Sequence, residues 1–174
     1  MMRAWRTRGP AAPLHPILVH FTIALTSSSL LFDTLGRVLA VSSLGDAAWW
    51  TLAAALPATL GAIVSGVTSR RRLPMEEGEA RSWLRAHMAL GPVFAGLLVA
   101  VAFWRGAARA DGAPVSWSYL AALGVVVAVM AVQGYLGGEL VYRFGAEVRG
   151  WYRRLPDETL PRTARPRDAR ARTV

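Results

Sequence analysis

Three histidines are the residues of this chain best suited to chemistry at neutral pH, because an imidazole can both ligate a metal and carry a proton. They are His15, His20 and His87. His20 lies four residues after Pro16, and His87 lies four residues after Trp83. In helices that begin at that proline and that tryptophan, both imidazoles lie about 6 Å inside. Two imidazoles facing each other at one depth predict bis-axial ligation of a b-type heme by His20 and His87.

A structural or proton-handling role for these histidines is left open by the same spacing. A histidine near a helix end can bond a backbone carbonyl or a lipid headgroup. His15 and His20 are five residues apart and therefore lie on different faces of a helix. His15 also precedes Pro16, which favours an extended conformation just before the helix. Zinc is less favoured, because three imidazoles without a well-placed carboxylate are a poor donor set.

Four other polar residues are expected at the same end as the histidines. We expect Arg70 and Arg71 to neutralise heme propionates. Glu139 and Tyr142, at the end of the last apolar stretch, are expected to form a polar site with His15. Elsewhere, Asp33 precedes Arg37 by four residues, which predicts an ion pair within one helix.

Small residues at four-residue spacing predict where helices pack closely in a bilayer. Gly134 and Gly138 form a GxxxG pattern. Gly66 and Gly91 belong to similar pairs with alanine. We expect these four glycines at helix contacts.

The elements that carry these residues are four long apolar stretches in a chain of 174 residues. Mean hydropathy is +0.32, and only 18% of the residues are charged, below the globular average of about 25%. A spanning helix needs about 20 apolar residues. The sequence therefore predicts an all-α integral membrane four-helix bundle with up-down-up-down topology, its spans at about residues 16–39, 47–69, 83–104 and 116–141.

The basic residues predict the orientation of this bundle. All 20 are arginines, and 17 of them flank the spans on the side of the two termini. The positive-inside rule makes both termini cytoplasmic. The domain reading is a basic N-terminal segment over 1–15, a transmembrane domain over 16–142 and an Arg-rich cytoplasmic tail over 143–174. A transit or signal peptide at the N-terminus is the less favoured interpretation.

This placement explains the net charge of +9 without nucleic acid as a partner. The expected partners are the lipid bilayer and other subunits of a membrane complex. The tail could lie on anionic headgroups, bind a subunit or only fix topology. The absence of cysteine excludes disulfides, thiolate metal sites and Fe–S clusters. No GxSxG, GxxxxGK[ST] or HExxH motif is present, so we do not expect an enzyme.

Two segments resemble a known family. Residues 15–25 read HPILVHFTIAL and residues 134–145 read GYLGGELVYRFG. Together they resemble the opening and closing motifs of the DUF2231 family of bacterial and archaeal four-helix membrane proteins, over roughly residues 13–148. The chain departs from the family pattern at Thr22, where a proline is usual, and at Ala146-Glu147. The resemblance implies the fold and an association with electron-transfer modules, but no settled activity.

Two functions follow as expectations. The first is a small subunit of the bacterial inner membrane, associated with electron transfer, that holds one b-type heme between its first and third helices near the cytoplasmic face. The second is a cofactor-free accessory or scaffold subunit of a larger respiratory or photosynthetic complex. A transporter is less favoured, because the spans show neither a charged mid-membrane site nor a repeat.

Overall fold

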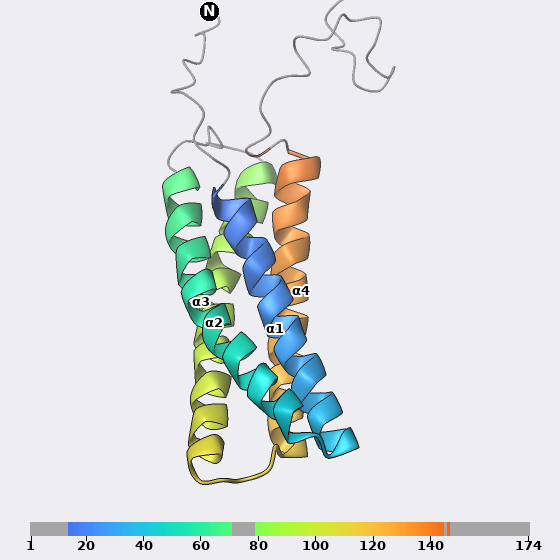
Figure 1. The fold of residues 1–174 in the computed structure, drawn as a ribbon. Coiled ribbons are helices and arrows are strands. Elements are labelled where there is room, and N and C mark those ends of the chain that lie inside the picture. The colour runs from blue at the N-terminus through green and yellow to red at the C-terminus, as the bar shows by residue number, and fades with distance from the viewer. Residues whose placement is uncertain (1–13, 71–78, 145, 147–174) are drawn as a thin grey trace, which may run out of the picture.

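The computed structural model describes residues 14–70, 79–144 and 146. Within these residues the chain forms four α-helices and no strand. They are α1 (Leu14–Leu39), α2 (Ser42–Arg70), α3 (Glu79–Ala110) and α4 (Trp117–Tyr142), and consecutive helices run antiparallel along one bundle axis (Figure 1). The all-α four-helix prediction is therefore confirmed.

Each helix is long and apolar enough to cross a membrane. The shortest have 26 residues, which at about 1.5 Å per residue exceeds a hydrocarbon core of about 30 Å. The helices run past the predicted spans, most clearly α3, which has 32 residues. The predicted spans were set by the apolar stretches, whereas a helix continues into the interface, where charged side chains reach water.

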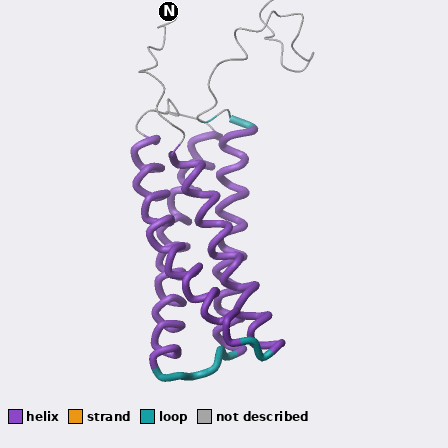
Figure 2. Tube along the Cα trace, viewed as in Figure 1, coloured by secondary structure: helices purple, strands orange, loops and turns teal. Residues whose placement is uncertain are grey.

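The bundle has two ends that the polar residues distinguish. We call the end where α1 begins and α4 ends the histidine end, and the opposite end the turn end (Figure 2). At the turn end, α1 connects to α2 through Ala40, whose φ is 56°, and the Val41 amide donates to the Gly36 carbonyl at 3.0 Å. Ser116 caps α4 by accepting a hydrogen bond from the Tyr119 amide at 3.1 Å.

The helices pack as two hairpins. α1 contacts α2 most closely and α3 contacts α4 next, while the α2–α3 and α1–α4 contacts are less extensive. α1 and α3 are therefore diagonal to each other, as are α2 and α4. Large side chains from α2, α3 and α4 fill the space between the hairpins. Many other large apolar side chains, such as Phe103 and Leu60, face outward, as expected where lipid is the solvent.

The helix α1 differs from the other three in what it buries. Its fully buried residues are Thr22, Thr26, Ser29 and Asp33, all of them polar. They follow one another at steps of four, three and four residues, so they form one stripe along one face of the helix. We call these four residues the polar stripe of α1. The fully buried apolar residues of the core come from the other three helices, and Leu25 and Leu30 of α1 pack against them.

Candidate functional site

The histidine end brings two imidazoles together, one from each of the diagonal helices. The rings of His15 on α1 and His87 on α3 have centroids 6.4 Å apart and planes at 88°. Both side chains are half-buried. We call them the imidazole pair. The helix α1 begins one residue before His15, so this histidine lies inside the helix and not in an extended segment before it.

The Nδ1 atom of each imidazole lies beside a backbone carbonyl of a neighbouring helix. His15 Nδ1 is 2.8 Å from the carbonyl oxygen of Ala62 on α2. His87 Nδ1 is 3.2 Å from the carbonyl oxygen of Gln133 on α4. A carbonyl can only accept, so Nδ1 must carry the hydrogen in both rings. Each Nε2 then keeps its lone pair.

Gln133 packs against His87 but leaves part of its own amide unpaired. Its Nε2 donates to the backbone carbonyl of His87 at 3.0 Å and lies 3.5 Å from His87 Nε2. Its Oε1 is buried without a hydrogen-bond partner in the described part of the chain. A buried unpaired amide oxygen marks this site as a place where a further polar group or ion could bind.

His20 does not belong to this cluster. Its side chain is exposed, and its Nδ1 lies 2.6 Å from the carbonyl oxygen of Pro16, one turn earlier in the same helix. The structure thus places His15, and not His20, next to His87. Seven residues make about two turns of a helix, so His15, seven residues before Thr22, lies on the same face as the polar stripe. His20 is only two residues before Thr22 and lies on the opposite face.

Of the other residues expected at this end, the structure describes Arg70, Glu139 and Tyr142. Arg70 is exposed at the end of α2, one turn after Gly66, and Arg71 lies outside the described residues. Glu139 is half-buried, and its carboxylate is 4.0 Å from Arg143. Tyr142 is 91% exposed and does not line the site.

Two glycines let the helices accommodate the imidazole rings. A Cβ atom on Gly66 would lie 2.9 Å from His15 Cε1, and one on Gly137 would lie 3.2 Å from His87 Cε1. Gly91 faces the Gln133 amide at 3.5 Å. Gly134 has no neighbouring atom within 4 Å of that position, and Gly138 has only Tyr142 of its own helix. The close approach on α4 is therefore at Gly137, which the four-residue pattern did not select.

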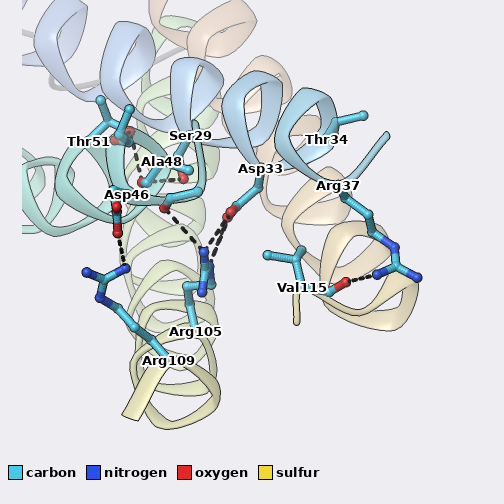
Figure 3. Close-up of polar contacts among 12 residues, drawn as sticks. Ser29, Asp33, Thr34, Arg37, Asp46, Ala48, Thr51, Arg105, Arg109 and Val115 are labelled. Atoms are coloured by element: carbon cyan, nitrogen blue, oxygen red, sulfur yellow. Dashed lines mark hydrogen bonds and ion pairs between the residues drawn. The ribbon is translucent and has the colours of Figure 1, made fainter. Parts of the chain in front are cut away.

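The turn end holds a second polar cluster around a buried ion pair. Asp33 is fully buried and Arg105 is 5% exposed, with Arg105 Nη2 2.9 Å from Asp33 Oδ1. Arg105 Nε also donates to Asp33 Oδ2 at 3.1 Å, and Nη2 donates to the Gly45 carbonyl at 3.2 Å. One guanidinium on α3 thus connects α1 with α2 (Figure 3).

The predicted Asp33–Arg37 ion pair is wrong. Arg37 instead donates to the Val115 carbonyl at 2.6 Å, and its guanidinium lies 5.0 Å from the centroid of the Trp117 ring. Figure 3 shows the two side chains leaving α1 in different directions. Asp33 faces the bundle interior as part of the polar stripe, and its partner there is Arg105 of α3.

A known protein family matches most of this chain. A model of the family described as "Predicted membrane protein (DUF2231)" matches residues 11–150. The chain belongs to the DUF2231 family. No curated protein and no solved structure matches it. The membership confirms the resemblance drawn from the two end motifs, and the four spanning helices agree with a multi-pass protein in a lipid bilayer.

Proposed function

We propose that this DUF2231 protein is a small membrane electron-transfer subunit that holds one b-type heme at its histidine end, with His15 and His87 as the axial ligands. The observation that carries the proposal is the imidazole pair. Metal–imidazole bonds of about 2 Å separate the centroids of two rings on one metal by roughly 6 Å. The separation of 6.4 Å between the two centroids fits that value.

The hydrogen bonds of the two rings support the same assignment. Histidines that bind a metal usually donate their second ring nitrogen to a carbonyl or carboxylate, which fixes the tautomer and the ring orientation. Here the carbonyls of Ala62 and Gln133 hold both Nδ1 atoms. Both Nε2 atoms therefore keep a lone pair, that of His87 with the Gln133 amide nitrogen 3.5 Å away. The two rings come from helices whose backbones do not contact each other.

The set of donor groups also favours heme over zinc. Zinc sites take at least three protein ligands, and the described residues contain no cluster of three histidine or acidic side chains. A porphyrin supplies four equatorial nitrogens and needs only the two axial ones. Arg70 is exposed at the same end of α2 and is the candidate partner for a propionate. When bound, the heme would supply one-electron transfer at the membrane surface.

The visible spectrum of the purified protein tests the proposal. We expect protein produced in heme-sufficient cells and purified in mild detergent to carry about one heme per chain, with a reduced-minus-oxidised difference spectrum typical of a b-type cytochrome. His15→Ala and His87→Ala should each abolish that spectrum. His20→Ala is the matched control and should leave it unchanged, because the His20 ring bonds only its own helix.

Two outcomes would contradict this assignment. Loss of heme in His20→Ala with retention in His15→Ala would restore the ligand pair expected from sequence. A flat spectrum in heme-sufficient protein would instead favour the cofactor-free accessory subunit, and the complex that co-purifies with the chain would then be the next observation to make.

A further inference from the structure

The turn end contains an open cavity whose inner wall is the buried ion pair. Its volume is about 510 Å³, within the range of about 300–1,000 Å³ that is usual for small-molecule sites. Asp33 and Arg105 line it, together with residues of the α1–α2 turn and of the connection between α3 and α4. Because it lies at the opposite end of the bundle from the imidazole pair, its role is independent of heme.

The charged residues that line this cavity carry an excess of positive charge. Three arginines and two aspartates line it. Arg105 pairs with Asp33, and Arg109 pairs with Asp46. Arg37 donates to the neutral carbonyl of Val115, so no carboxylate among the described lining residues offsets its charge.

The start of α2 adds to this positive potential. Ser42 is its first residue, and both Ser42 and Gly45 line the cavity. The first amides of a helix carry a partial positive charge. The cavity therefore favours an anionic ligand over a cation.

Two buried polar groups next to the cavity have unused hydrogen-bonding capacity. Arg105 donates through Nε and Nη2, and its Nη1 has no partner among the residues that the structure describes. This atom is not among the fully buried unpaired ones, so it keeps accessible surface on a residue that lines the cavity. Behind the lining residues, the buried hydroxyl of Tyr119 lies within interaction range of Asp33 and has no hydrogen-bond partner in the described part of the chain.

We propose that this cavity binds a small oxyanion, a carboxylate or a phosphate, which accepts a hydrogen bond from Arg105 Nη1 and is flanked by Arg37 and Arg109. A guanidinium holds its N–H donors in a fixed planar fork. Arg105 Nη1, which has no partner among the described residues, can donate to an anionic oxygen. The Asp33 carboxylate holds the other side of the guanidinium, so the donor is oriented before the ligand arrives. The oxyanion could come from a free anion or from the headgroup of an anionic lipid, since the turn end lies at a membrane surface.

Binding of inorganic phosphate to the full chain in nanodiscs of phosphatidylcholine tests the free anion. We expect a saturable heat of binding and a saturable rise in melting temperature, neither of which sodium chloride of equal ionic strength reproduces. Arg109→Gln should weaken binding at least fivefold, and Arg105→Lys, which keeps the charge but lacks the fork, at least tenfold. Arg143→Gln is the matched control, since Arg143 is similarly exposed and paired with Glu79 at the histidine end.

Lipid binding is distinguished in the same system. If phosphate has no effect but phosphatidylglycerol added to the nanodiscs is retained by the wild-type chain and lost from Arg109→Gln, the oxyanion is a lipid headgroup. The absence of both responses would overturn the proposal, as would an equal loss in Arg143→Gln, which would show unspecific attraction. Because Arg105→Lys could destabilise the fold, Arg109→Gln, an exposed position, is the decisive variant.

Discussion

Asp33 and Arg105 are the most costly side chains that the bundle buries, and their geometry shows how that cost is offset. The carboxylate is fully buried and receives three N–H contacts from a single guanidinium. Removing both charges can leave the stability unchanged, whereas removing one charge leaves the other unpaired in an apolar environment. The pair therefore acts as a specific connection between α1 and α3, two helices without direct backbone contact.

Replacing one member of this pair should be strongly destabilising. We expect Asp33→Asn to lower the free energy of unfolding by about 3–5 kcal/mol, because it leaves the Arg105 charge buried without a counter-ion. The comparison is Asp46→Asn, whose partner Arg109 is exposed, with an expected loss of no more than about 1 kcal/mol. Unfolding in detergent micelles with increasing SDS measures both changes.

The double variant Asp33→Leu with Arg105→Met separates charge from packing. It should recover most of the stability that Asp33→Asn loses, because no charge remains buried. If Asp33→Asn and Asp46→Asn prove equally mild, the Asp33–Arg105 pair is better hydrated than its burial indicates.

The residue-scale errors of the sequence reading have one physical cause. The i,i+4 rule compares neighbours on one helix, so it paired Asp33 with Arg37, while the true partner lies 72 residues away. Likewise, equal depth in two helices does not bring His20 and His87 together, because His20 lies on the exposed side of α1. The steps of three and four residues from Thr22 to Asp33 show that face, and extended backwards they select His15.

At the scale of elements, the polar stripe makes α1 a helix that is held by hydrogen bonds as well as by packing. Ser29 donates to the Ala48 carbonyl of α2 at 3.0 Å, and the hydroxyl oxygens of Thr22 and Thr59 lie 3.4 Å apart across the same two helices. Small polar side chains let two helices approach closely in a bilayer, which agrees with the close contact of α1 and α2. The hydroxyl of Thr26 has no partner among the described residues.

Two substitutions in this stripe should have opposite effects. Thr26→Val keeps the shape and removes an unpaired buried hydroxyl, so we expect it to raise the free energy of unfolding by about 1 kcal/mol. Ser29→Ala removes an interhelical hydrogen bond and should lower it by about 0.6–1.7 kcal/mol. Unfolding of both variants in the same detergent measures the difference. A loss of stability in Thr26→Val would indicate that the hydroxyl bonds an internal water.

The positions of the four helices were predictable from this sequence. Which side of each helix faces the bundle, and which residues it contacts there, was only partly predictable. Length and apolar composition decide whether a segment spans a bilayer, and all four spans were found. Which face turns inward is a weaker signal, because lipid and core are both apolar. The GxxxG pattern at Gly134 illustrates the limit, since its expected contact is absent from the described structure and Gly137 makes it instead.

At the scale of the whole molecule, the distribution of arginine agrees with the antiparallel bundle. Among the described residues, Arg70, Arg81, Arg85 and Arg143 lie at the histidine end. Arg37, Arg105 and Arg109 lie at the turn end, where Arg105 is buried and Arg109 is paired with an aspartate. The positive-inside rule counts charge near the ends of spans, so the histidine end is expected to face the cytoplasm and the oxyanion cavity the opposite side.

Labelling of single cysteines tests this orientation, and the chain suits the method because it has no cysteine of its own. Ala113→Cys lies in the exposed connection at the turn end, and Ser82→Cys is exposed in the first turn of α3. In intact spheroplasts of a bacterial host, we expect a membrane-impermeant maleimide to label the Ala113→Cys variant at once and the Ser82→Cys variant only after permeabilisation. The reverse pattern would show that the protein inserts against the arginine bias, and that the histidine end and the turn end exchange sides. Labelling of both variants without permeabilisation would show that the arginine distribution does not fix one orientation, since each chain would then insert either way.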